Sequence, residues 1–154
     1  MHVVAEVLQL LSAACLGLFA GAMLTEGLVL VPYWRSLAPH EFFAWYAAND
    51  RRLVGFFGPL TTATALLAVA AALASLWDGR PGRGPAVLAA ALAVSVVATF
   101  FVYFRRANET FAAAAVRPDA LPAELARWAA WHHARTGVSV VALASALVAV
   151  WLGA

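Results

Sequence analysis

The sequence predicts an all-α integral membrane protein, built as a bundle of four transmembrane helices. Of its 154 residues, 64% are hydrophobic and 12% are charged, a balance far outside that of ordinary soluble domains. The apolar residues form long runs of Ala, Leu and Val that lack the alternation of a half-buried strand. Because lipid cannot satisfy backbone polar groups, such runs indicate helices.

Four runs approach or exceed the roughly 20 residues that cross a bilayer as a helix, and together they predict a single transmembrane domain over residues 1–154. The predicted spans are 7–32, 53–77, 85–104 and 137–152. The first run is interpreted as a retained span and not as a signal peptide. Residues 1–7 contain no Lys or Arg, and the apolar stretch exceeds the core of a signal peptide.

The first long connection, "SLAPHEFFAWYAANDRR", predicts a short helix that lies on the membrane surface. Pro39 stands where it can open a helix, and Phe42, Phe43, Tyr46 and Asn49 follow at helical spacing. In the second long connection, Pro122 and Glu124 mark a helix start. We expect this helix to continue through "RWAAWHHART", so that the fourth helix is extended.

The arginines predict the orientation of the chain in the membrane. Because successive connections alternate sides, residues 35–52 and 105–136 share one face, and both termini share the other. Eight of the ten arginines lie on the first face, which the positive-inside rule makes cytoplasmic. We therefore expect a bacterial inner membrane protein with both termini outside the cytoplasm. Arginines placed for function would produce the same bias, so this alternative stays open.

Charge and cysteine content exclude several classes of function. A net charge of +2 gives no nucleic-acid footprint, so the expected partners are the lipid bilayer and a small aromatic or lipophilic substrate. Cys15 is alone in the middle of the first span, which excludes a disulfide framework and a cysteine-based metal site. The sequence leaves the oligomeric state open, and a homo-oligomer is compatible with so small a bundle.

Glu26 lies about a turn and a half inside the first apolar run. An isolated carboxylate in this position is costly, and it marks a functional site by default. A bundle of four helices brings the cytoplasmic ends of the other spans around it. The candidate partners there are Arg51, Arg52, Arg105, Arg106, Asn108, Glu109, His132 and Arg135. The alternative is an ion pair that only fastens the bundle.

The start of the fourth helix carries a polar and aromatic stripe. Trp128, Trp131, His132 and Arg135 follow the i, i+3, i+4, i+7 spacing of one helix face, and His133 points elsewhere. A stripe of this kind predicts a shared target. The alternative for His132 is an interfacial histidine that is hydrogen-bonded to backbone.

Three sequence patterns together carry a resemblance to a known family. A Gly-rich first span ends in "VPYWRSLAPHEFFAWY", "NETF" follows the third span, and "WAAWHHART" leads into the fourth. Over nearly the whole chain this resembles the anthrone-oxygenase-like family of small four-helix membrane proteins. The family pattern of an Asn followed by W-x-x-x-H-x-x-R matches Asn108, Trp128, His132 and Arg135. The chain departs from the family at the neighbours of Asn108, where the apolar residue and proline usual in the family are absent.

The resemblance implies an oxidoreductase that inserts oxygen into a reduced polycyclic aromatic such as an anthrone. His132 would act as general base, because an imidazole titrates near neutral pH, and Arg135 would stabilise the enolate oxygen. Trp128 and Trp131 would stack on the flat substrate. The expected catalytic set is His132, Arg135, Glu26, Asn108 and Glu109, and the expected substrate-binding set is Trp128, Trp131, Tyr103 and Arg52.

This chemistry demands no cofactor, because the enolate reacts with dioxygen directly. A metal-dependent variant would use His132, Glu26 and Glu109, a set suited to iron or manganese. A different class of function also stays open. In it, a non-enzymatic membrane protein binds a ligand or uses Glu26 for proton-coupled transport.

Overall fold

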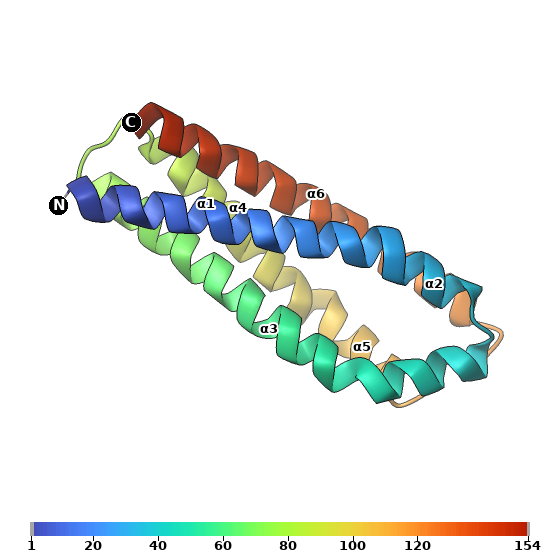
Figure 1. The fold of residues 1–154 in the computed structure, drawn as a ribbon. Coiled ribbons are helices and arrows are strands. Elements are labelled where there is room, and N and C mark those ends of the chain that lie inside the picture. The colour runs from blue at the N-terminus through green and yellow to red at the C-terminus, as the bar shows by residue number, and fades with distance from the viewer. Residues whose placement is uncertain (1, 154) are drawn as a thin grey trace.

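The computed structural model describes residues 2–153 as four long antiparallel helices with no strand among them. All four are long and apolar enough to cross a membrane. The two ends of the chain lie at the same end of the bundle, and the two long connections lie at the other (Figure 1). This arrangement confirms the predicted all-α four-helix bundle.

The first long helix contains one wider turn. It begins as α1 (His2–Thr25), passes through a π-helical turn, η1 (Glu26–Leu30), and ends as α2 (Val31–Ser36). Single π-helical turns within α-helices are uncommon and are often found at functional sites. The turn begins at Glu26, the residue that the sequence marks as costly.

The second helix, α3 (Pro39–Trp77), is continuous over 39 residues. Pro39 opens it as predicted, and the Glu41 carboxylate accepts a hydrogen bond from the Ala38 N–H at 2.9 Å. The prediction of a separate surface helix is wrong, because this segment is the first part of α3. Phe42 and Tyr46 are buried against the other helices, so their apolar side chains pack inside the protein and not on the membrane surface.

Residues 78–82 connect the second helix to the third, and residues 113–120 connect the third helix to the fourth. The third comprises α4 (Arg83–Thr99), a second π-helical turn, η2 (Phe100–Phe104), and α5 (Arg105–Ala112). The fourth, α6 (Leu121–Gly153), is unbroken and confirms the predicted extension.

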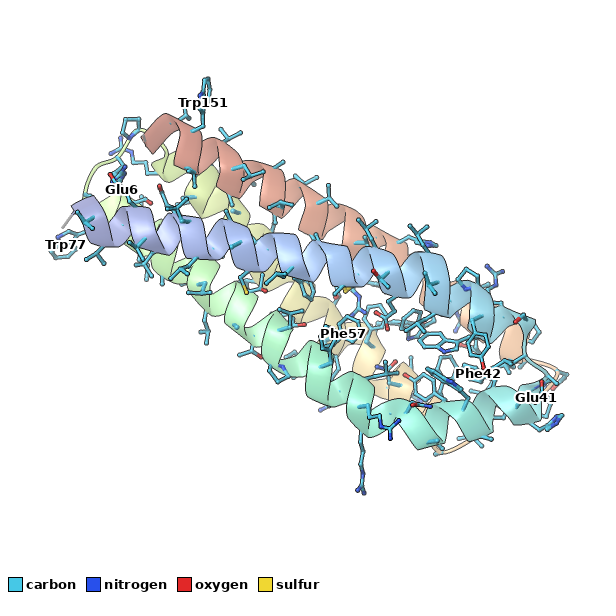
Figure 2. The ribbon with its side chains drawn as sticks, viewed as in Figure 1. Glu6, Glu41, Phe42, Phe57, Trp77 and Trp151 are labelled. Carbon is cyan, nitrogen blue, oxygen red and sulfur yellow. The ribbon has the colours of Figure 1, made fainter. Side chains whose placement is uncertain are left out.

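The bundle has two kinds of core. Near the chain ends the core is built mainly of alanines such as Ala72, Ala89, Ala93 and Ala146, whose small side chains let the helices approach closely. Near the two long connections it is aromatic, and Trp34, Phe42, Tyr46, Phe104, Phe111 and Trp128 pack mainly edge to face. Figure 2 labels Phe42 in this part of the bundle. Helices packed around large rings stand farther apart than helices packed around alanine, which leaves room for a site.

The length of the helices places the aromatic end at the membrane boundary. A 39-residue helix measures about 58 Å, whereas the hydrocarbon of a bilayer is about 30 Å thick. Trp77 and Trp151 are 81% and 76% exposed at the end that holds the chain termini, as expected for interface anchors. Counting about 20 residues back from them reaches Phe57 on α3 and Trp131 on α6. The aromatic core therefore lies at and beyond the headgroup region.

Candidate functional site

Glu26 is the centre of a buried polar cluster. Its side chain is 5% exposed, and its Oε2 atom lies 3.4 Å from both Nη2 of Arg135 and Nδ1 of His132. Both partners are on α6, more than a hundred residues away in the chain. Of the eight candidate partners that the sequence offers, the structure brings these two into contact with the carboxylate.

Arg135 is held by groups from three helices. Besides Glu26, its Nη2 atom lies 3.3 Å from Nδ1 of His132, and its guanidinium carbon stands 3.8 Å from the centroid of the Phe104 ring. The ring face offers negative charge density, so it stabilises the cation that the apolar surroundings would otherwise disfavour. Phe104 closes η2, and Glu26 opens η1, so both π-helical turns contribute a contact to the same arginine.

His132 is fully buried and is fixed on both ring nitrogens. Nε2 lies 2.8 Å from the Met23 carbonyl oxygen, one turn before η1, and so donates its proton there. In the neutral ring Nδ1 is then the acceptor, and it faces the donor Nη2 of Arg135. One ring face stacks on Trp128, at 5.0 Å between centroids and 9° between planes. A Cβ added at Gly27 would stand 3.1 Å from the imidazole, so this position leaves little space for a side chain.

Trp128 connects this cluster to Asn108. Its indole Nε1–H donates to Oδ1 of Asn108 at 2.9 Å. This bond orients the amide, because the oxygen must face the indole and the amide nitrogen is left to donate elsewhere. Asn108, Trp128, His132, Arg135 and Glu26 thus form one chain of contacts.

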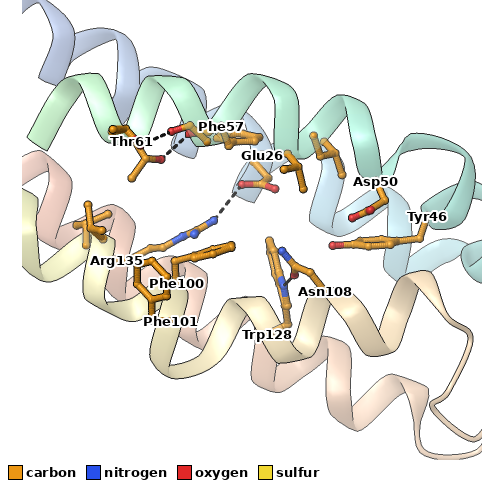
Figure 3. Close-up of a pocket in the computed structure, with 16 residues that line it drawn as sticks. Glu26, Tyr46, Asp50, Phe57, Thr61, Phe100, Phe101, Asn108, Trp128 and Arg135 are labelled. Atoms are coloured by element: carbon orange, nitrogen blue, oxygen red, sulfur yellow. Dashed lines mark hydrogen bonds and ion pairs between the residues drawn. The ribbon is translucent and has the colours of Figure 1, made fainter.

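A cavity of about 200 Å³ lies between α3 and the third helix. Its size is below the roughly 300–1,000 Å³ of pockets for drug-sized ligands, so it suits a small molecule. Val54 and Phe101 line it and are also exposed on the outside of the bundle. Figure 3 shows the apolar rings of Phe57, Phe100 and Phe101 and the polar groups Glu26, Tyr46, Asp50, Asn108 and Arg135 around this space.

A second space, a groove of about 390 Å³, lies on the other side of α3, against α1 and η1. Asn49 and Arg52 line one part of it, and Phe56 and Ala22 line another. Glu26, Leu53 and Phe57 line both the cavity and the groove. The carboxylate of Glu26 is therefore at the partition between them.

Four of the predicted site residues line the cavity, and His132 lies just behind them. Glu26, Asn108, Trp128 and Arg135 are at its wall. His132 does not line it, because Trp128 and Arg135 stand in between. The structure therefore places His132 where it contacts Glu26 and Arg135 directly and a ligand in the cavity only through them.

The other four predicted residues are outside the cavity. Trp131, 37% exposed, stacks on Tyr103 at 5.1 Å and 11°, so the two rings pair with each other and do not face the site. Glu109 is exposed on α5, and Arg52 lines the groove. The physical reason is helix phase. For Glu109, the π-helical turn η2 before it adds a residue to one turn and rotates the side chains that follow. Trp131 and Arg52 are on α6 and α3, which are regular helices, so their directions follow from how these helices pack.

The predicted metal set is not assembled. Within residues 2–153, no three His, Cys, Asp or Glu side chains come together in a way that could hold a metal ion. Glu26 and His132 are adjacent, but Glu109 points outward from α5. The remaining pair also has an arginine beside it, which would repel a cation.

The sequence prediction did not include the α3 residues that line the cavity. Tyr46, Asp50 and Phe57 line the cavity, and Tyr46 is 2% exposed. A signal existed in the spacing of residues 46, 50, 53, 57 and 61, which recurs every three or four positions as one helix face does. Interpreting the segment as a surface helix assigned this face to the membrane.

The fold and the site define a class: a four-helix protein of membrane character with a buried carboxylate, imidazole and guanidinium at one end. No protein-family model, curated protein or solved structure matches the chain.

Proposed function

We propose that this chain is a small membrane oxidoreductase that oxygenates a flat, reduced aromatic molecule, as its resemblance to anthrone-oxygenase-like proteins implies. The observation that carries the proposal is the position of Glu26. A carboxylate that is paired with Arg135 stands at the wall of a mainly apolar cavity whose lining includes Val54 and Phe101, which are exposed on the outside of the bundle. A hydrophobic substrate would enter from the bilayer and meet a base and a cation together.

Glu26 is the base in this mechanism, and not His132 as the sequence predicts. Of these two residues Glu26 lines the cavity and His132 does not, and a general base must reach the proton that it removes. Arg135 holds the carboxylate from behind through a contact of 3.4 Å, and His132 supports Arg135 by accepting a hydrogen bond from its Nη2 atom at 3.3 Å. His132 is therefore a positioning residue.

The reaction balances without a further reductant. Glu26 takes a proton from the activated methylene carbon of an anthrone, and the electron pair passes to the carbonyl oxygen as an enolate, which Arg135 stabilises. The enolate carbon reduces dioxygen to a bound peroxide, which takes the proton back from Glu26 as a hydroperoxide. Loss of the remaining hydrogen of that carbon with the terminal hydroxide, as water, gives the quinone. One anthrone and one dioxygen yield one quinone and one water.

The test measures quinone formation and oxygen uptake by the protein in lipid nanodiscs supplied with anthrone. We expect one dioxygen per quinone and a rate above that of empty nanodiscs. Glu26→Gln should lower this rate by about 10²-fold or more, the contribution of a general base. Glu6→Gln is the matched control, because Glu6 also pairs with an arginine, Arg80, but at the opposite end of the bundle. Equal rates in wild type and Glu26→Gln would remove the base assignment.

The second candidate is a non-enzymatic ligand-binding protein, which the same apolar cavity favours. In that case anthraquinone would bind to wild type without any protein-dependent oxidation of anthrone. Proton-coupled transport through Glu26 has less support, because the space between the helices toward the chain ends, lined mostly by alanines between residues 9 and 149, measures about 10 Å³.

We further propose that the chain resides in a bacterial inner membrane with both termini outside the cytoplasm. The support is the excess of arginine at the end of the bundle that holds the site. Accessibility of cysteines introduced next to Trp77 and Arg117 to a membrane-impermeant reagent in intact cells tests this orientation. Labelling near Arg117 alone would reverse it.

A further inference from the structure

We propose that the groove between α1, η1 and α3 is a binding site for an anionic phospholipid, with the phosphate at Arg52 and an acyl chain along Ala22 and Phe56. This site is separate from the aromatic-substrate cavity, and the proposal does not depend on the oxygenase reaction. The groove lies between helices of membrane character, so lipid is the molecule that meets it first.

The polarity of the groove changes along its length as the polarity of a phospholipid does. Asn49 and Arg52, together with the apolar Leu30 and Trp45, line the part nearer the long connections, and Ala22, Phe56 and Phe57 line the part nearer the middle of the bundle. An amphipathic molecule would place its head at the first part and its chain along the second. A wholly apolar or wholly polar ligand would leave one part of the groove mismatched.

The depth of Arg52 matches that of a lipid phosphate. Phe57 is about 20 residues from Trp77 and thus lies close to the hydrocarbon boundary. Arg52 is five residues farther along α3, about 7 Å by helical rise. The headgroup region is roughly 5–8 Å thick on each side of a bilayer, so the backbone at Arg52 lies at this depth.

The guanidinium of Arg52 is available to a ligand. Its contact in the structure is a hydrogen bond from Nη1 to Oδ1 of Asn49 at 3.5 Å, the limit for such a bond. No ion pair in residues 2–153 includes Arg52, and the nearest carboxylate in the groove, Glu26, pairs with Arg135 instead. The planar guanidinium donates two parallel hydrogen bonds to phosphate oxygens, which favours an anionic head over a neutral one.

The chain offers a matched control at the adjacent position. Arg51 is at nearly the same depth and carries the same charge, but it does not line the groove. A general attraction of anionic lipid to basic residues would involve both arginines equally. A built site would involve Arg52 alone.

The test is native mass spectrometry of the purified protein titrated with phosphatidylglycerol or phosphatidylcholine. We expect Arg52→Gln to weaken the first bound phosphatidylglycerol by about fivefold, the contribution of one interfacial arginine, while Arg51→Gln leaves it unchanged. Phosphatidylcholine, whose choline offsets the charge of its phosphate, should bind more weakly to wild type and lose less affinity than phosphatidylglycerol in Arg52→Gln. Ala22→Phe, which fills the apolar part of the groove, should weaken both lipids.

Three results would overturn the proposal. One is equal affinity of wild type and Arg52→Gln for phosphatidylglycerol. Another is equal loss in Arg51→Gln and Arg52→Gln, which would assign the effect to diffuse surface charge. The third is equal affinity of the wild type for the two lipids, which would show that the net charge of the head does not contribute to binding. Because Arg52 is exposed, its replacement should leave the unfolding temperature unchanged, and that measurement accompanies each titration.

Discussion

The imidazole of His132 lies parallel to the indole of Trp128, with 5.0 Å between ring centroids and 9° between planes. The two residues are one helical turn apart on α6, and each carries a further contact. Trp128 binds Asn108, and His132 contacts Arg135 and Glu26. The stacked pair therefore joins the amide on α5 to the carboxylate on η1, and its integrity decides whether the cluster holds its geometry.

We predict that His132→Ala destabilises the protein by about 2–4 kcal/mol. The change leaves a cavity beside Trp128 and removes the donor to the Met23 carbonyl oxygen. His133→Ala is the matched control, because His133 is exposed and should cost no more than about 0.5 kcal/mol. Thermal unfolding in detergent measures both. A similar small loss in the two variants would contradict the structural role of the buried ring.

Two glycines of the first long helix should respond oppositely to alanine. A Cβ at Gly27 would stand 3.1 Å from Cδ2 and Nε2 of His132, so Gly27→Ala should displace the imidazole and cost about 1–3 kcal/mol. Gly21 has open space around its Cα, and Gly21→Ala should be neutral or stabilise the helix by up to ~1 kcal/mol. Comparison of the two unfolding temperatures checks this, and the reverse order would disprove the close contact at Gly27.

The bond between Trp128 and Asn108 should appear as a coupling energy. We expect Trp128→Phe and Asn108→Ala together to cost about 1 kcal/mol less than the sum of the single changes, since either change alone already breaks the hydrogen bond. The control cycle replaces Trp131 by Phe, because Trp131 stacks on Tyr103 instead. Additive effects in the first cycle would show that the bond contributes nothing to stability.

Arginine and lysine should not be interchangeable at position 135. Lysine keeps the charge near Glu26 but loses the planar group that lies on the ring of Phe104, so we expect Arg135→Lys to cost about 2 kcal/mol. In a Phe104→Leu background most of this cost should vanish. Arg127→Lys, at an exposed pair with Glu124, is the control and should have little effect. An undiminished cost in the Phe104→Leu background would exclude the ring as the partner.

The sequence predicted the helices well because hydropathy is a property of the local chain. Runs of apolar residues, Pro39 at a helix start and Pro122 with Glu124 before the last helix all act within a few residues of themselves. The cost of a lone acid in lipid is local as well, and it identified Glu26. The candidate partners of Glu26 all lie at the same end of the predicted bundle. The sequence therefore already predicted that Glu26 could contact His132 or Arg135.

The sequence predicted less well in which direction individual side chains point. The regular spacing of residues 128, 131, 132 and 135 predicted one stripe, but the structure divides it between the site and a stacked pair with Tyr103. The segment that contains Tyr46 was assigned to the membrane surface, although its rings complete an interior core.

The sequence alone determined that four helices of membrane character form and that the candidate site residues lie at one end, because both follow from local chain chemistry. Only the tertiary structure decided which polar residues touch. Two π-helical turns change the phase of their helices, and the rotation of each helix against its neighbours is set by packing between residues far apart in the chain. No local pattern contains that rotation, so Glu109 and Trp131 face outward while Asn108 and Trp128 face the site.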